Sequence, residues 1–254
     1  TTGSPLKLIF QFSLPLIFGN LIQQFYSFAD AIIVGRLISS NALAAVGTTG
    51  PMSFLVFGFV YGLSSGFAVI IAQRFGAKDG QGLRESFAIN IKLNFLSALF
   101  FTSLSLLLAK PLLRAINTPQ EIFADALTYI LIMFIGIFFI VVYNAGACIL
   151  RALGDSKSPL YFLIVASVLN VILDIVFILV FNWGVAGAAW ATVISEGISG
   201  LLCVVHIIRK FPMLHLKKRD FRRNSHFTFQ HLKIGVPMAF QFSITAIGVI
   251  ILQG

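Results

Sequence analysis

The sequence predicts an all-α integral membrane protein: a six-helix transmembrane lobe followed by the start of a seventh helix. Three observations carry this prediction. The 254 residues are 58% hydrophobic and only 11% charged, whereas a soluble domain has roughly 25% charged residues. The mean hydropathy is +0.95. Apolar runs of about 20 residues, the length that a helix needs to cross a bilayer, recur along the chain.

The apolar runs place the spans at about residues 8–37, 48–73, 87–109, 122–148, 158–181 and 185–208, with a seventh opening near 232. The segments between them are rich in Gly, Pro and charge, as loops are. The first run is longer than a signal-peptide core and lacks a cleavage pattern, so we expect it to remain as the first span.

The predicted domains are a six-helix lobe (1–208), a basic cytoplasmic linker (209–231) and the start of a second lobe (232–254). Because the chain has no initial Met and stops within an apolar run, we expect it to be cut at both ends.

Basic residues predict a cytoplasmic N-terminus. With that orientation, 14 of the 18 lysines and arginines lie on the cytoplasmic side, and Arg36, Lys110 and Arg114 lie outside. Lys92 lies near the inner end of the third span and can snorkel there. The net charge of +9 then reflects topology and contact with anionic lipid. We interpret the run KKRDFRR as a linker rather than a nucleic-acid patch.

Two further patterns concern the cysteines and an internal repeat. Cys148 and Cys203 lie in or near apolar spans without disulfide or metal-site spacing, so we interpret them as small buried apolar residues. The segment SLPLIF (13–18) is similar to GVPMAF (235–240), and each opens a span. Six spans separate the copies, so the repeats would be parallel, related by an axis along the membrane normal.

Three of the nine acids fall within spans: Asp30, Asp174 and Glu196. No Lys or Arg lies deep in any span to neutralise them. A buried, unpaired carboxylate is costly, so each must be protonated, bind a cation or face a water-filled cavity. The alternative is a neutral structural carboxyl bonded to a backbone carbonyl, and it carries most weight for Glu196.

The depth of the polar residues groups them. Asp30, Asp174, Thr192 and Tyr129 each lie 7 residues from the outer end of their predicted span, about 10 Å at a rise of about 1.5 Å per residue. Asn170 and Asp174 are neighbours on one helix face. We therefore expect one polar level in the outer half of the membrane, built from oxygens that suit a hard cation or a proton.

Polar stripes lead to two of the acids. On the first span the stripe is Asn20, Gln24, Ser27 and Asp30, and on the sixth it is Thr192, Ser195, Glu196 and Ser199. Such stripes line a cavity or join helices, although a single Ser or Thr often bonds only its own helix. Pro15 lies about four turns before Asp30 and should kink the first helix.

The residues resemble a known family. The segment SLPLIFGNLIQQFYSFADAIIVGRLISSNALAAVG resembles the first span and following loop of the multidrug and toxic compound extrusion (MATE) transporters. LRALGDSKSP resembles their loop between spans four and five, and NVILD and GAAWATVISEG resemble spans five and six. The resemblance extends over residues 5–254.

The resemblance implies both an architecture and an activity. Members have twelve spans in two six-helix lobes with pseudo-twofold symmetry, so this chain would be the first lobe plus the start of span seven. Members export cationic amphipathic compounds in exchange for protons or sodium. Asp30 would be the first-span acid whose protonation or ion binding is coupled to helix bending at Pro15.

The resemblance also implies a cation or proton site. The residues that match the family's first-lobe site and its polar surround are Asn170, Asp174, Thr192, Tyr129 and Asn144. In a sodium-coupled protein the metal ligands would be Asp30, Asn170, Asp174 and Thr192. Asn144 lies well toward the cytoplasmic side. Glu196 departs from the family, where a neutral polar residue is expected, and is either an additional protonation site or a carboxyl that faces a groove.

We therefore expect a multidrug efflux antiporter that works by alternating access, not an enzyme. The expected coupling ion is H⁺ or Na⁺, without a cofactor, and the expected partners are drugs and membrane lipids, without nucleic acid. We expect a monomer that crosses the plasma (inner) membrane repeatedly.

Three alternatives stay open: a flippase for lipid-linked oligosaccharide or precursor, a passive channel and a membrane enzyme. The flippase would need basic residues in its cavity, and none is seen in these spans. The enzyme would need a His cluster, paired acids at a membrane face or a nucleophile beside a base. The four histidines instead lie in or beside the linker, without ligand partners in the spans.

Overall fold

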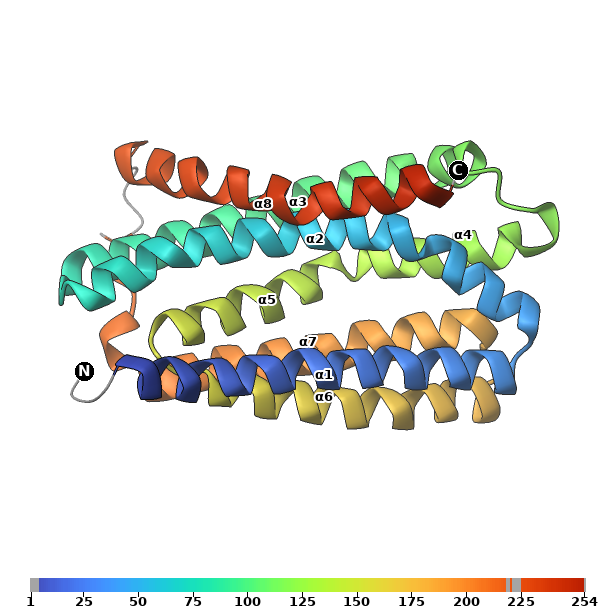
Figure 1. Ribbon diagram of the computed structural model, residues 1–254, viewed down its shortest axis with the longest axis horizontal. Helices are drawn as coiled ribbons and strands as arrows, with labels where there is room; N and C mark the ends of the chain where they lie inside the picture. The colour runs from blue at the N-terminus through green and yellow to red at the C-terminus, as the bar shows by residue number, and fades with distance from the viewer. Residues whose placement is uncertain (1–4, 218–219, 221–224, 254) are drawn as a thin grey trace.

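The computed structural model describes residues 5–217, 220 and 225–253, and this part of the chain is all-α, as predicted (Figure 1). The helices are α1 (Pro5–Leu37), α2 (Ser40–Gly76), α3 (Gly80–Ala115), α4 (Gln120–Ile135), α5 (Ile137–Ala152), α6 (Lys157–Ile175), α7 (Gly184–Lys210) and α8 (Ser225–Gln253). A π-helical turn, η1 (Val176–Val180), continues α6, and a 3-10 turn, η2 (Pro212–Leu214), follows α7.

The helices correspond to the predicted spans, with differences at the linker. Helix α8 begins at Ser225 rather than near residue 232, so part of the predicted linker is helical. The linker residues Lys218, Arg219, Arg222 and Arg223 lie outside the described residues. Arg84 of α3 lies 3.8 Å from the buried carboxylate of Asp220, which ties the described part of the linker to the bundle.

Length and hydropathy indicate a multi-pass membrane protein. Within the described residues, α2, α3, α6 with η1, and α7 are each long and apolar enough to cross a membrane, and α4 and α5 qualify together as one bent pair. Helices α1 and α8 are not in this set, but both run along the same axis (Figure 1). With 33 and 29 residues they are about 50 and 44 Å long, more than the roughly 30 Å of a bilayer core.

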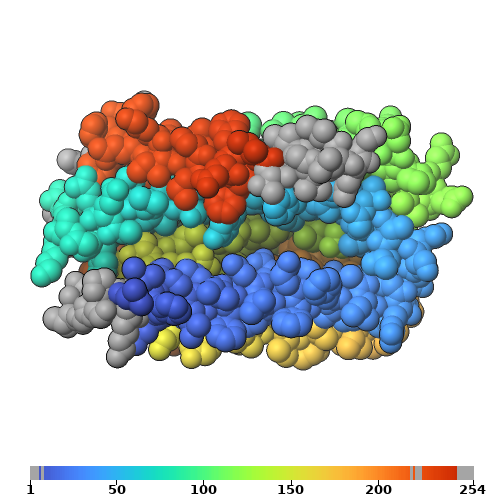
Figure 2. All heavy atoms as spheres, viewed as in Figure 1, coloured from blue at the N-terminus to red at the C-terminus, as the bar shows by residue number. Residues whose placement is uncertain are grey.

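The helices form two groups joined by α4 and α5. Helix α1 packs against α6, and α6 against α7, while α2 packs against α3 and α8. A hydrophobic core between α2, α3, α4 and α5 includes the fully buried Leu113 and Phe134. Figure 2 shows a groove between α1 and α2, with α5 recessed in it. Helices α1 and α8 run in the same direction (Figure 1).

A break at Gly136 divides the predicted fourth span. Helices α4 and α5 meet there at an angle of 47°. Gly136 packs so tightly against the side chain of Val193 in α7 that a Cβ at this position would overlap it. Because Gly136 has no Cβ, the bend between α4 and α5 can lie directly against α7, next to Thr192. We attribute the bend to this close packing.

Small residues also bring α2 and α8 together. A Cβ added to Gly62 would lie 2.5 Å from the Cα of Ala239, and one added to Gly66 would lie 2.5 Å from the Cα of Gly235. These four residues allow two backbones to approach more closely than larger side chains permit, as in small-xxx-small contacts between membrane helices. Helix α8 thus belongs firmly to the packed body of the structure.

Candidate cation site

The structure brings together four predicted side chains from four helices. Asp30 lies on α1, Asp174 on α6, Thr192 on α7 and Tyr129 on α4. All four are buried, with exposed fractions of 9% or less. The Tyr129 ring lies near both carboxyl groups, with which its hydroxyl interacts electrostatically. Asn170, one turn before Asp174, is also fully buried.

The hydroxyl of Thr192 has no free hydrogen-bonding capacity. It donates to the carbonyl oxygen of Ala188 at 3.1 Å and accepts from the hydroxyl of Tyr26 at 3.2 Å and from Nδ2 of Asn170 at 3.3 Å. A hydroxyl has one proton and two lone pairs, so all of its sites are used. Thr192 therefore fixes α1 and α6 to α7 in this conformation.

The carboxyl oxygens, in contrast, have unused capacity. Oδ1 of Asp30, both Oδ atoms of Asp174 and Oδ1 of Asn170 are buried and accept no hydrogen bond from protein groups in the described part of the chain. Among the described residues, no Lys, Arg or His lies within 4.0 Å of either carboxyl. Four buried oxygens on α1 and α6 therefore have free lone pairs and no positive partner among the described residues.

Asp30 and Asp174 are close enough for one carboxyl to hydrogen-bond the other. Two ionised carboxylates are acceptors only, so this contact requires a proton on one of them or a cation between them. The pair can thus hold a single positive charge between its carboxyl oxygens. Hard cations prefer such ligands.

The backbone changes its winding directly after Asp174. Helix α6 ends at Ile175 and continues as the π-helical turn η1, in which the amide of Phe181 bonds to the carbonyl of Val176. Short π-helical turns occur frequently at functional sites. The apolar run predicted one regular span here and contains no signal of the π-helical turn.

Helix α1 carries the predicted polar stripe, but its members differ in environment. Asn20, Gln24 and Ser27 are exposed, whereas Asp30 is buried. The helix continues through Pro15 without interruption from Pro5 to Leu37. Because proline has no backbone N–H, the helix lacks one internal hydrogen bond at that turn.

Asn144 does not belong to this group in the structure. It lies half-buried on α5, two residues before Gly146, which packs against Cys203 of α7. Asn144 is therefore level with about residue 201 of α7, roughly 13 Å along the axis from Thr192. The prediction that placed it in the polar surround came from the resemblance alone, whereas the depth argument did not include it.

Tyr26 was not among the predicted site residues. It joins α1 to Thr192 through its hydroxyl and lies one turn from Asp30, but an aromatic residue in an apolar run gives no signal of this role. Glu196 lies one turn past Thr192 and lines a separate small pocket, which Tyr26 also lines.

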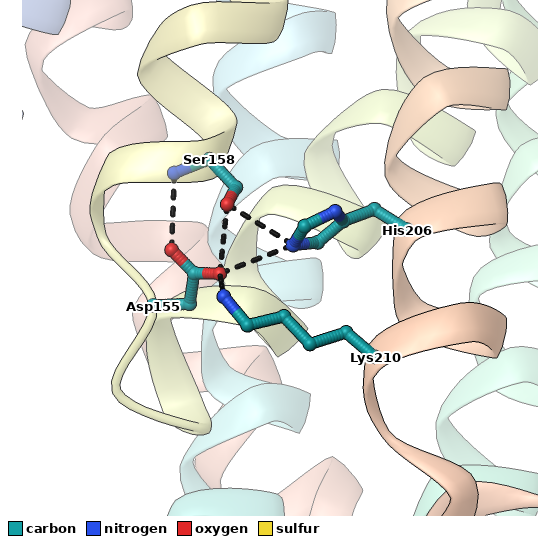
Figure 3. A network of polar contacts seen from close by, with 4 residues as sticks. All are labelled: Asp155, Ser158, His206 and Lys210. Carbon is teal, nitrogen blue, oxygen red and sulfur yellow. Dashed lines mark hydrogen bonds and ion pairs between the residues drawn. The ribbon is translucent and has the colours of Figure 1, made fainter.

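A second polar cluster lies where the α5–α6 loop meets α7 (Figure 3). Asp155 accepts hydrogen bonds from Nζ of Lys210 at 2.7 Å and from the hydroxyl of Ser158 at 2.7 Å, and lies 3.2 Å from Nε2 of His206. Burial alone would raise the pKa of Asp155, but these three partners outweigh it and hold the pKa below its ordinary value.

This cluster is not arranged as a hydrolytic triad. The hydroxyl of Ser158 at 3.1 Å and Oδ2 of Asp155 at 3.2 Å both approach Nε2 of His206, whereas a triad uses the two opposite ring nitrogens. The contacts instead tie the loop to α7. His206 was expected to have no ligand partners in the spans; its two polar contacts are Asp155 in the loop and Ser158 in the first turn of α6.

Comparison with known proteins identifies the family. The MatE family model matches residues 15–176. This chain belongs to the MatE family. The MatE chain is 34% identical over 245 residues to the probable multidrug resistance protein YpnP of Bacillus subtilis, covering 96% of this chain and 54% of YpnP. It is 30% identical over 243 residues to the probable multidrug resistance protein YoeA of the same organism, covering 93% and 52%.

Solved structures show the same fold. The MatE chain matches a crystal structure of MATE in the bent conformation with a TM-score of 0.86 and 30% identity, over 93% of this chain and 53% of that chain. The MatE chain thus spans about half the length of the relatives it matches. The resemblance to MATE transporters predicted from the sequence is confirmed.

Proposed function

We propose that this chain is the first lobe of a multidrug efflux antiporter that exports cationic amphipathic compounds in exchange for protons or sodium ions. The relatives named as multidrug resistance proteins support the efflux of drugs. The observation that carries the coupling is the buried pair of Asp30 and Asp174, which have no basic partner among the described residues. Such a pair is stable only with a positive charge between its members.

Occupancy of the pair changes the force between α1 and α6. Two like unit charges about 4 Å apart repel by about 4 kcal/mol at an effective dielectric constant of about 20. This energy changes the ratio of two conformations by roughly a thousandfold. Loss of the cation therefore drives Asp30 away from Asp174, and binding of the cation draws α1 back onto α6.

Helix α1 is the element that responds. It packs mainly on α6, and it is joined to Thr192 of α7 through the Tyr26 hydroxyl. The turn at Pro15 lacks one backbone hydrogen bond, so bending is easiest there. Movement of α1 reshapes the groove between α1 and α2 (Figure 2), which in this proposal holds the drug. Cation and drug then weaken each other's binding reciprocally.

The test is export of a fluorescent organic cation by the full-length protein in membrane vesicles, driven by a sodium gradient in one arm and a proton gradient in the other. Asp30→Asn and Asp174→Asn should each abolish the gradient-dependent part of export. Asp125→Asn, which removes an exposed carboxyl on α4, should leave it unchanged. Undiminished gradient-driven export by both site variants would end the proposal, and leakage of ions without drug exchange would favour a channel.

The same proposal includes the membrane location, the orientation and the division into lobes. We propose a monomer in the plasma (inner) membrane. Its N-terminus is placed in the cytoplasm because most lysines and arginines then lie in cytoplasmic loops. Residues 1–208 form the first lobe, and α8 starts the second. In a sodium-coupled protein Asp30, Asn170, Asp174 and Thr192 would hold the ion. Thr192 would then have to release Tyr26 or Asn170, since its hydroxyl is saturated.

A further inference from the structure

A small pocket lies between α1, α6 and α7. It is one helical turn from Thr192, which in turn lies beside the pair of Asp30 and Asp174. The residues that line it are Tyr26, Leu163, Ala166, Ser167, Ser195 and Glu196. Four of the six carry side-chain oxygen atoms, and they come from all three helices. Oxygen atoms from all three helices therefore border the pocket, although most of its accessible lining is apolar.

Two of these oxygens have no hydrogen-bond partner. Oε2 of Glu196 and the hydroxyl oxygen of Ser195 are both buried and unpaired in the described part of the chain. Within that part, Glu196 also has no Lys, Arg or His within 4.0 Å. A buried carboxylate without a partner is costly, so the free oxygens require a positively charged or hydrogen-donating occupant.

The size of the pocket restricts that occupant. Its interior is far smaller than the clefts of roughly 300–1,000 Å³ that hold drug-sized ligands. The interior has room for about one water-sized particle. A proton alone would need one oxygen and no space. Several converging oxygens around a water-sized space instead suit a small hard cation.

The pocket adjoins the main site without merging with it. Tyr26 lines the pocket and donates its hydroxyl to Thr192. Glu196 is four residues after Thr192 on α7, so it faces the same side of the helix one turn, about 6 Å, farther on. A cation at Glu196 would therefore lie next to the bond that holds Tyr26 on Thr192.

We propose that the Glu196 pocket is a second sodium-binding site, distinct from the Asp30–Asp174 pair and separated from it by Tyr26. This inference rests on the proposed function, in which the pair holds the coupling ion. Glu196 supplies the charge, and Ser195 and Ser167 supply neutral oxygens. Sodium in this pocket occupies a second site next to the main one. Tyr26 lies between the two sites and controls movement of the ion from one to the other.

The experiment is equilibrium binding of radioactive sodium to the purified full-length protein in lipid nanodiscs, with potassium as the competing control ion. Glu196→Gln should remove one sodium ion per protein and Asp30→Asn should remove another, with additive loss in the double variant. Glu121→Gln, which neutralises an exposed carboxyl at the start of α4, should bind as much sodium as the wild type. Because only differences are used, sodium bound elsewhere cancels.

A second variant tests the inference if Glu196→Gln does not fold. Ser195→Ala keeps the carboxylate and should weaken the affinity of one sodium ion by roughly threefold to tenfold. Unchanged sodium binding by both Glu196→Gln and Ser195→Ala would overturn the inference, as would loss of all sodium in Asp30→Asn alone. These results are separable from the export assay. Normal export by the Asp30 and Asp174 variants refutes the proposed antiport, whereas the loss of one sodium ion in Glu196→Gln is measured at equilibrium and does not depend on export.

Discussion

Replacing Gly62 by alanine should loosen the contact between α2 and α8. The added Cβ would lie 2.5 Å from the Cα of Ala239, 2.7 Å from the carbonyl oxygen of Met238 and 2.8 Å from the amide nitrogen of Ala239, whereas ordinary contact begins at 3.4 Å. The α8 backbone must therefore move away by about 0.9 Å. All three atoms belong to the backbone, so no side-chain rotation can relieve the overlap.

The magnitude follows from comparison with a neighbour on the same stripe. A Cβ at Gly58 would have as its nearest contact the carbonyl oxygen of Phe242, at 3.6 Å, an ordinary distance. Both substitutions gain up to about 1 kcal/mol from the better helix propensity of alanine, and this gain cancels in the difference. Overpacking costs about 1–3 kcal/mol, so Gly62→Ala should be less stable than Gly58→Ala by that amount.

The assay is thermal unfolding of the two full-length variants in detergent. For a domain of this size 1 kcal/mol corresponds to roughly 2–4 °C, so the Tm values should differ by roughly 2–12 °C. Gly58→Ala itself should melt at or slightly above the wild-type temperature. Equal Tm values for the two variants would refute the close backbone contact between α2 and α8.

Two further predictions concern other contacts. The Asp155 carboxyl has a depressed pKa in the folded state, so its stabilisation is present above its unfolded pKa of about 3.9 and is lost as the pH falls through the folded value. Asp155→Asn should lower the free energy of unfolding by about 1–3 kcal/mol at pH 7 and make it less dependent on acid pH, measured by thermal melting between pH 7 and pH 3. An unchanged dependence of Tm on pH would contradict the role of the Asp155 contacts. Gly136→Ala should lower the free energy of unfolding by about 1–3 kcal/mol through overlap with Val193. The control Gly47→Ala, whose added Cβ would meet nothing within 4 Å, should not lower it. Equal Tm values for these two variants would count against the packed bend.

The sequence predicted the helices because hydropathy depends on local composition. Each predicted span is present as a helix or a helix pair. Counting residues predicted that Asp30 and Asp174 lie close together, as they do, whereas Thr192 bonds to Tyr26 and Asn170, each of which lies one turn before an acid. The break at Gly136 was not predictable, because the cause is the packing of Val193 from a distant helix.

The polar site was predictable only in part. Its acids stand out in apolar runs, so Asp30, Asp174 and Glu196 are visible in the sequence. The role of Tyr26 is not, because it depends on a hydrogen bond to a residue 166 positions away. The placement of Asn144 needed the parallel packing of α5 on α7, which no single-helix pattern contains. The roles of these residues in ion binding stay predictions.

The saturated hydroxyl of Thr192 has a kinetic consequence. An ion that takes this oxygen as a ligand must first break its bond to Tyr26 or Asn170. Each such bond is worth about 1 kcal/mol, which is about fivefold in the dissociation constant, and differences of this kind appear mostly in the rate of departure. In the proposed sodium-coupled antiporter, these protein hydrogen bonds would shorten the time that an ion stays at Thr192.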